Sequence, residues 1–328
     1  MAQLVKLLDY VSRYESDLSR YPTQYIRLKN AQWERMKTQW EHGVDLSDRT
    51  PIHEETEEQA EEGKWYTPLT RLFGSRKGRA DEEELLETNN DGQDDVNGLD
   101  FNPHIIYNPE TVMELRKLYL DQLFHFQLKW ASSTMMEKSN LDAAFMRDSL
   151  LRSFTQQLPD SYLLFYYPIL KVKKAPVELD IILITPIECF CITVLEAENA
   201  AAFIGDGDRF WTKKYGEMES RVLNPLIGLT RMEKIVSGIF AAKEVDFPIK
   251  KMVISRNGYI DYPGVPFDTH IIDRRTYEDW FASIRKSTVP MKFNQFKAAQ
   301  SILDIGQTTA VSRLFEEQIE QGQHETNE

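Results

Sequence analysis

The sequence contains little cysteine, and it shows neither a long apolar run nor a recognisable export signal. It holds two cysteines, Cys189 and Cys191, in 328 residues. On a strand they would share one face, and they are too close along the chain for an ordinary disulfide. We therefore expect buried thiols in a reducing compartment. No apolar run approaches the roughly 20 residues that span a bilayer, and residues 1–12 lack the pattern of an export signal. These absences predict a cytoplasmic protein without a membrane segment.

Positive charge is also scarce. The chain carries 39 Lys and Arg against 52 Asp and Glu, a formal net charge of -13. Phosphates need Lys and Arg to displace their counterions, so this balance disfavours nucleic-acid binding over the whole surface. Much of the acid falls between residues 44 and 103, however. A locally basic cleft in a folded part of the chain therefore remains an open alternative.

The first 103 residues divide into two regions of different composition. Apolar residues at three- and four-residue steps predict two helices within residues 1–43, the first over about 4–21, interrupted by Pro22. Residues 44–103 are acidic with few apolar side chains, which predicts a mostly disordered linker. An aromatic island at residues 65–73 interrupts it. We expect a protein partner to bind through residues 1–43, as a hairpin or docking helices, or through this island. Packing of the island on its own domain is an equally weighted alternative.

The second half of the chain alternates helix and strand patterns. Asn108-Pro109-Glu110 opens one helix, and Asn224-Pro225 opens another, since a capping side chain and a first-turn proline favour helix starts. Short apolar runs that suit buried strands lie between and after them. Strands are expected at 162–172, 180–185, 189–195, 251–255 and 270–272, and further helices at 140–157, 275–286, 294–303 and 308–321. We predict an α/β domain over residues 104–305 and a C-terminal helix and tail over 306–328.

Motifs between Ser139 and Ile272 resemble the nuclease-related domain (NERD) family. An acid followed by an apolar strand ending in Thr-Pro is the strongest. The motifs are Leu158-Pro159-Asp160-Ser161-Tyr162, Glu178-Leu179-Asp180 through Thr185-Pro186, Arg209-Phe210-Trp211 and Asn224-Pro225-Leu226. The resemblance implies an aromatic-containing strand at Arg209-Phe210-Trp211. The resemblance implies a mixed sheet flanked by helices, distantly related to the PD-(D/E)XK restriction-endonuclease-like fold.

The resemblance also implies a metal-dependent site, in which two strand carboxylates hold Mg²⁺ and a lysine stabilises developing charge. Asp180 matches the first carboxylate of the family. Aligned without gaps, the second acid and the lysine correspond to Thr193 and Leu195, and neither side chain can do that chemistry. The site is therefore expected to be degenerate.

A three-residue slip offers an alternative in which the site is active. It brings Glu196 and Glu198 into the two positions, and Asp148 lies near the place of the family's upstream helix acid. A slip by an odd number of residues turns side chains to the opposite face unless a bulge absorbs it. If the protein is active, we expect Asp180, Glu196, Glu198 and Asp148 to be catalytic. Asp180 and Glu196 would then hold the Mg²⁺.

Plain structural roles compete with these functional ones. Asp180 can be a solvent-facing acid at a strand start, and Glu196 and Glu198 an exposed strand end. We therefore predict a NERD-domain protein that is non-catalytic, needs no cofactor, and acts as a binding or scaffold module in the cytosol. The alternatives are a divergent Mg²⁺-dependent phosphodiesterase acting as a nuclease, and a nucleic-acid binder without cleavage.

Overall fold

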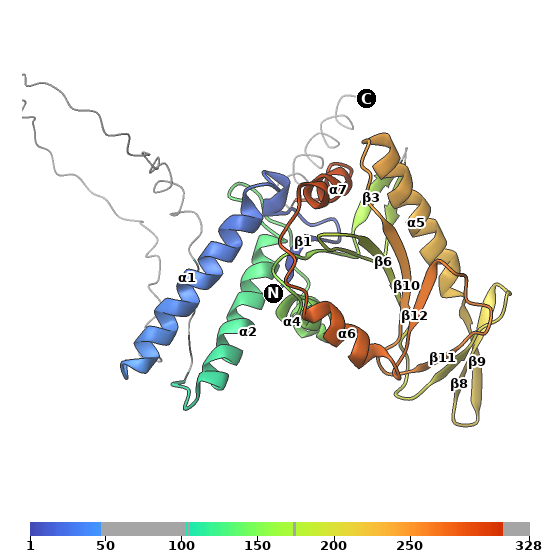
Figure 1. The fold of residues 1–328 in the computed structure, drawn as a ribbon, viewed down its shortest axis with the longest axis horizontal. Coiled ribbons are helices and arrows are strands. Elements are labelled where there is room, and N and C mark those ends of the chain that lie inside the picture. Colours follow the sequence, from blue (N-terminus) through green and yellow to red (C-terminus); the bar gives the residue numbers. More distant parts are fainter. Residues whose placement is uncertain (47–100, 102, 104, 106, 173–174, 311–328) are drawn as a thin grey trace, which may run out of the picture.

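The chain forms an α/β domain built on one mixed sheet (Figure 1). The computed structural model describes residues 1–46, 101, 103, 105, 107–172 and 175–310. The predicted linker core with its island at 65–73 lies outside these residues, as does the tail from 311 onward. Among the described residues, no helix combines the length and the apolar character needed to cross a membrane.

Six strands make up the central sheet, in the order β1-β2-β5-β6-β10-β12. They are β1 (Gln3–Leu7), β2 (Leu163–Tyr166), β5 (Ile181–Ile184), β6 (Cys189–Val194), β10 (Ile249–Ile254) and β12 (Thr269–Ile272). The pairs β2–β5 and β5–β6 are antiparallel, and the pairs β1–β2, β6–β10 and β10–β12 are parallel. The expected mixed sheet is therefore confirmed.

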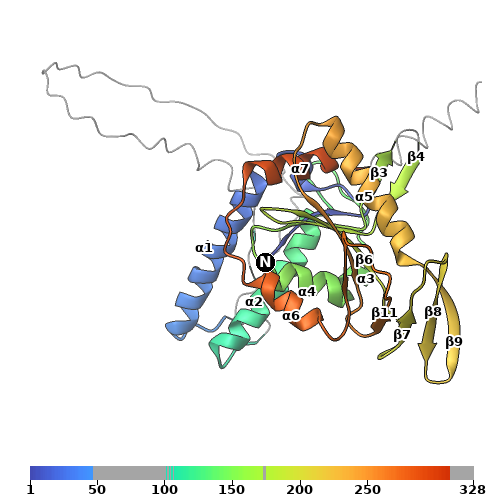
Figure 2. The ribbon, with the colours of Figure 1, turned by 45° about the vertical axis from the view of Figure 1, so that its right-hand side comes forward.

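Helices cover both faces of this sheet, because successive residues of each strand point to opposite sides. Phe165 and Ile182 face the side covered by α5 (Pro225–Ala242) and α7 (Phe293–Leu303). Leu164 and Leu183 face the side covered by α2 (Val112–Trp130), α4 (Ser149–Gln157) and α6 (Tyr277–Arg285). The three layers are visible in Figure 2. The flanking helices expected from the sequence are thus present.

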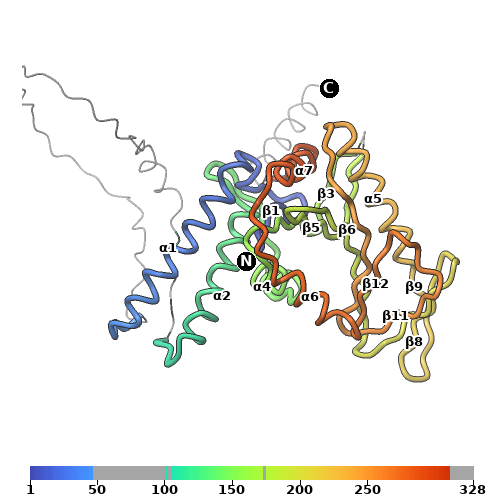
Figure 3. Tube along the Cα trace, viewed as in Figure 1, coloured from blue at the N-terminus to red at the C-terminus, as the bar shows by residue number. Residues whose placement is uncertain are grey.

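The expected helix over residues 4–21 is wrong. Residues 3–7 form β1, and all five are buried. Leu4 and Val5 pack into opposite clusters, so the segment is a strand covered on both faces, and it also buries the polar side chains of Gln3 and Lys6. Figure 3 shows this blue strand within the sheet. After a 3-10 turn η1 (Arg13–Glu15), α1 (Tyr21–Glu41) begins with Pro22 in its first turn, where proline is tolerated.

Residues 1–43 therefore belong to the α/β domain and are no separate hairpin. Their strand β1 pairs with β2, and α1 packs its buried Tyr25 against Trp130 of α2, with ring centroids 5.9 Å apart. Gln127 of α2 completes the edge of β1. Its side chain accepts from the Leu4 amide at 2.9 Å and donates to the Ala2 carbonyl at 2.9 Å. The side-chain amide of Gln127 thus supplies the hydrogen bonds that a neighbouring strand would supply, because buried backbone groups at a sheet edge need partners.

Two expected elements are each split in two. The helix predicted at 140–157 is α3 (Ala144–Arg147) followed by α4, with Asp148 between them as the cap of α4. The strand predicted at 162–172 is β2 followed by β3 (Ile169–Val172), which forms a hairpin with β4 (Ala175–Glu178). Tyr167 separates β2 from β3 with a left-handed φ of 49°.

A smaller sheet, in the order β11-β7-β8-β9, extends from the domain at the lower right of Figure 1. Its strands are β7 (Ala202–Ile204), β8 (Phe210–Tyr215), β9 (Met218–Leu223) and β11 (Tyr259–Asp261). Trp211 of β8 is fully buried against Gly205, where a Cβ would lie 2.7 Å from the indole ring. Of these strands, the sequence predicted only the one around Trp211.

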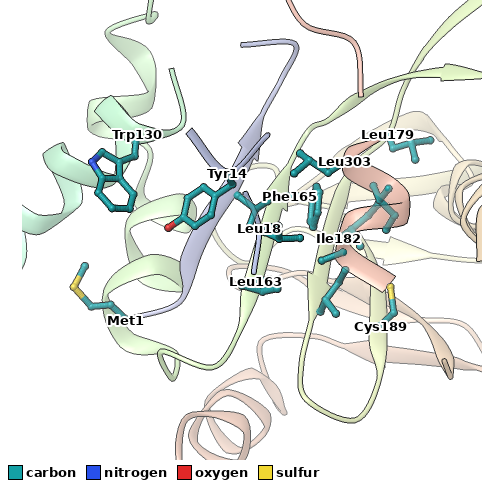
Figure 4. Close-up of a cluster of buried hydrophobic side chains, with 14 of the residues drawn as sticks. Met1, Tyr14, Leu18, Trp130, Leu163, Phe165, Leu179, Ile182, Cys189 and Leu303 are labelled. Atoms are coloured by element: carbon teal, nitrogen blue, oxygen red, sulfur yellow. The ribbon is translucent and has the colours of Figure 1, made fainter. Parts of the chain in front are cut away.

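The core continues from the N-terminal region into the sheet (Figure 4). Tyr14 and Trp130 lie at one end of the cluster, and Ile182 and Leu303 at the other. Cys189 lies beside them, and both cysteines are buried and free, as expected. A hydrogen bond with Cys191, and after it burial, raise the pKa of Cys189, so this thiol stays protonated.

Candidate functional site

The candidate site lies at one end of the central sheet. The pairs Tyr166↔Ile181 and Ile181↔Ile192 bring the end of β2, the start of β5 and the end of β6 together. The pair Ile254↔Val194 adds the end of β10. The functional side chains of four neighbouring strands therefore meet here.

Asp180 and Thr193 are partners at this end. The β5–β6 ladder runs from Ile184↔Cys189 to Ile181↔Ile192 without a bulge, so the next position sets Asp180 beside Thr193. Thr193 Oγ1 donates to Asp180 Oδ2 at 2.6 Å. The register of β5 and β6 is thus without a gap, and it sets Thr193, and neither Glu196 nor Glu198, beside Asp180. A hydroxyl stands where the resemblance implies the second carboxylate.

Leu195 stands where the family's lysine is expected. Its amide donates to the carbonyl of Ile254 at 2.8 Å, so the chain is still beside β10 at this point. An aliphatic side chain supplies no charge for a phosphate. Thr193 and Leu195, the two positions to which the resemblance assigns the second acid and the lysine, therefore carry neither an acid nor a cation.

Asp148 caps the helix α4. Its Oδ1 accepts from the amides of Leu150 at 2.9 Å and Leu151 at 3.0 Å. Its Oδ2 accepts from the hydroxyl of Tyr166 at 2.6 Å. Burial and this hydrogen bond raise the pKa of Tyr166, so the phenol stays the donor. Both carboxylate oxygens of Asp148 are engaged in holding α4 against β2.

Glu196 forms an ion pair with Arg256, which follows β10. Arg256 Nε lies 2.5 Å from Glu196 Oε1, and Arg256 Nη2 lies 2.8 Å from Oε2. The backbone amide of Arg256 also donates to Oε1 at 3.2 Å. The hydrogen bonds with Glu196 raise the pKa of Arg256. This fork-on-fork arrangement neutralises Glu196 and leaves it a poor ligand for a cation.

Glu198 is directed elsewhere, toward the smaller sheet. Its two carboxylate oxygens lie 3.0 Å and 2.9 Å from Lys213 Nζ on β8. The hydrogen bond from Lys213 lowers the pKa of Glu198. Asp148, Asp180 and Glu196 each have their own partner near this end of the sheet, in Tyr166, Thr193 and Arg256, and Glu198 is bound to another element.

Tyr167 was missed by sequence reasoning. Burial raises the pKa of Tyr167 to about 12, and the charges of Asp180, Asp148 and Glu196 add to this effect, in that order. The negative charges of these three carboxylates therefore act on the phenol of Tyr167. Its left-handed backbone is unexpected before Pro168, since a residue before proline favours extended conformations. No signal in the sequence pointed to this residue.

The clustered residues do not fit a magnesium ion. Within the described part of the chain, no three His, Cys, Asp or Glu side chains are grouped so that they could hold a metal. Mg²⁺ requires oxygen ligands in near-octahedral geometry, usually from carboxylates. Asp180 has the Thr193 hydroxyl beside it, and Glu196 is paired with Arg256. The carboxylates at this end of the sheet are therefore paired with protein groups, Asp180 with Thr193 and Glu196 with Arg256.

Comparison with known proteins gives one partial likeness. A protein of Geobacillus stearothermophilus named RNA 2',3'-cyclic phosphodiesterase is 34% identical to this chain over 129 residues. The matched part is 39% of this chain and 36% of that protein, so the chain spans about a third of the length of its relative. No family model matches the chain, and no solved structure matches it.

Proposed function

We propose that this protein is a non-catalytic binding or scaffold module of the NERD type, built on a restriction-endonuclease-like domain and acting in the cytoplasm. The observation that carries the proposal is the hydrogen bond from Thr193 to Asp180. Thr193 stands at the position from which a second carboxylate would have to bind a metal together with Asp180. The ion pair of Glu196 with Arg256 removes the nearest substitute.

The exposed face of α1 supports a protein partner. The inner face of this helix is buried through Pro22, Tyr25 and Met36. Its outer face presents exposed polar side chains such as Glu34 and Arg35. The island at 65–73 is the second partner segment that we propose, and it lies outside the described residues. Nucleic acid is the less favoured partner, because the chain has a net charge of -13.

A cleavage assay tests the proposal. Single- and double-stranded DNA and RNA are incubated with the full chain and Mg²⁺ or Mn²⁺, beside the variant Asp180→Ala. We expect no cleavage above the level of the variant, because no pair of carboxylates is available for the ion. Robust cleavage by the natural chain that Asp180→Ala abolishes would defeat the proposal in favour of a divergent nuclease.

A second candidate is phosphodiester hydrolysis of RNA ends. It is favoured by the likeness to the protein named RNA 2',3'-cyclic phosphodiesterase, 34% identical over 129 residues. The test uses a short RNA ending in a 2',3'-cyclic phosphate, with and without divalent metal. Under the binding proposal the cyclic ester stays closed. Opening of the ring to a phosphomonoester by the natural chain, reduced in Asp180→Ala or Tyr167→Phe, supports this second candidate instead.

A further inference from the structure

An apolar groove with a basic rim runs along the outer face of α5. It is a hollow of about 930 Å³ between this helix and the β3–β4 hairpin, which lies beside α5 in Figure 2. Val172 and Val177 of the hairpin form one wall. Ile235 and Ile239 of α5 form the other, and Ile305 lies at one end. These five side chains are partly exposed in the structure.

Helix α5 is apolar on two sides; the core buries one of them and covers the other, with Ile235 and Ile239, only in part. Leu229, Met232 and Val236 pack inward and are buried. The outward side carries Ile235, Ile239 and Gly238, and a Cβ added at Gly238 would meet no atom within 4 Å. An apolar stripe of this kind on a surface helix is typical of a face that another segment covers.

The charge around the groove is of one sign. Lys171, Arg231, Lys234 and Lys243 line it, and no acidic residue does so within the described part of the chain. Lys243 is paired with Asp304. The other three cations have no ion pair in the described structure. The occupant that fits this rim is therefore acidic with apolar anchors.

The C-terminal segment of this chain has that chemistry. Residues 311–321 read Val-Ser-Arg-Leu-Phe-Glu-Glu-Gln-Ile-Glu-Gln, with three glutamates and one arginine. Val311, Leu314, Phe315 and Ile319 recur at steps of three and four, the spacing of one helical face. Such a segment matches the recognition of amphipathic helices by apolar grooves. These residues lie outside the described part of the chain.

The segment is also tethered within reach. Ile305 lines the groove, and Lys171 donates its amide to the Ile305 carbonyl at 2.7 Å. Residue 310 is the last described position before the segment. It follows Ile305 by five residues, so it lies at most about 18 Å from Ile305. The segment therefore starts within this distance of Ile305, and a covalent tether favours an intramolecular contact over one with a separate molecule.

We propose that the groove on α5 binds the acidic C-terminal segment of the same chain, residues 311–321. Leu314, Phe315 and Ile319 fill the space over Gly238, and the glutamates face Lys171, Arg231 and Lys234. A partner protein with the same pattern would compete for the groove. This inference is independent of the proposed function, since it concerns a surface away from Asp180.

Disulfide trapping in the full chain tests the proposal. The native cysteines are buried in β6 and give little background reaction. One variant combines Gly238→Cys with Phe315→Cys. The matched control combines Gly228→Cys with Phe315→Cys, since Gly228 is also an open glycine on α5 but does not line the groove. The two helix positions are roughly 15 Å apart along the axis.

We expect the Gly238 pair to form an intramolecular disulfide about tenfold faster than the Gly228 pair, because docking raises the local concentration of the thiols. Adding Arg231→Glu and Lys234→Glu removes most of this advantage, and Lys286→Glu, at an exposed position directly after α6, does not. Circular dichroism shows whether each variant is folded.

Three results would overturn the proposal. Equal rates in the two pairs would show that the segment does not select the groove. An absence of trapping in both pairs would show that it does not reach α5. A disulfide that forms between two molecules, with a yield that rises with protein concentration, would assign the groove to a second copy of the chain.

Discussion

The hydroxyl of Thr193 donates a hydrogen bond of 2.6 Å to the carboxylate of Asp180 across the β5–β6 ladder. Under the proposed NERD relationship, this pair stands where a metal-dependent nuclease would have two facing carboxylates. The threonine hydroxyl satisfies one oxygen of Asp180 without any cation. A neutral hydroxyl therefore takes the place beside Asp180 that a second metal ligand would need.

A second acid placed beside Asp180 should create a metal site. In Thr193→Glu, two carboxylates face each other from adjacent strands and repel until a cation bridges them. We expect a lower Tm in the absence of metal and a saturable rise of Tm with Mn²⁺ or Mg²⁺. A ligand at 100 times its Kd stabilises a folded state by about 2.7 kcal/mol.

The matched control for this variant is Thr193→Gln, which has similar volume and no charge. Thermal melts of both variants and of the natural chain are recorded over a range of metal concentrations. An equal rise of Tm in the Gln variant, or a similar rise in the natural chain, would contradict the idea that Thr193 is what blocks the metal.

Asp148 should prove to be structural. Asp148→Ala removes the cap of α4 and the acceptor for Tyr166, and loss of a cap costs about 0.5–2 kcal/mol in unfolding free energy. Asp148→Asn keeps one acceptor oxygen and should lose less. Urea unfolding of both variants measures the difference. If the two variants were equally destabilised, or if both instead lost a metal response, the capping role would be refuted.

Gln127 should stabilise the edge of the sheet. Gln127→Leu leaves the Leu4 amide and the Ala2 carbonyl buried without their partner, and an unsatisfied buried group costs about 1–3 kcal/mol. Chemical unfolding of the variant measures this loss. Gln157→Leu on the exposed end of α4 is the control and should change stability by less than about 0.5 kcal/mol. Equal effects in the two variants would show that the edge contacts contribute nothing specific.

The sheet and its main helices could be predicted because their signals are local. Short apolar runs marked β5, β6 and β10, and Asn224-Pro225 marked the start of α5. Strand β1 was missed because Leu4 and Leu7 within it, and Leu8 directly after it, mimic helical spacing. Its real partner, β2, lies more than 150 residues away in the sequence, and no local pattern reports such a pairing.

The candidate site was predictable in part for the same reason. The gapless register, and with it the pairing of Asp180 with Thr193, follows from the simplest turn between β5 and β6. The partners of the other acids come from distant segments, since Arg256 is 60 residues from Glu196. Tyr167 carried no signal, because a left-handed residue before a proline is contrary to local preference.

The pKa of Tyr167 offers a direct test of how the acids are arranged. Burial is the largest cause of its rise to about 12, and the charge of Asp180 is the next. Asp180→Asn should therefore lower the pKa of Tyr167, though not to the ordinary value of 10.0. Glu178→Gln should lower it less, because Glu178 has the smallest named effect. NMR titration of ring-labelled tyrosine measures both shifts, with Tyr167→Phe assigning the resonance.

The same shift has a consequence for stability at alkaline pH. The folded chain holds the phenolic proton of Tyr167 to about 12, whereas the unfolded chain releases it near 10.0. The contribution of this group is therefore complete below pH 10 and is lost as pH rises toward 12. Tyr167→Phe should lose less stability than the natural chain over this window. Parallel losses in the two proteins, or a larger shift in Glu178→Gln than in Asp180→Asn, would show that Tyr167 does not lie among these carboxylates.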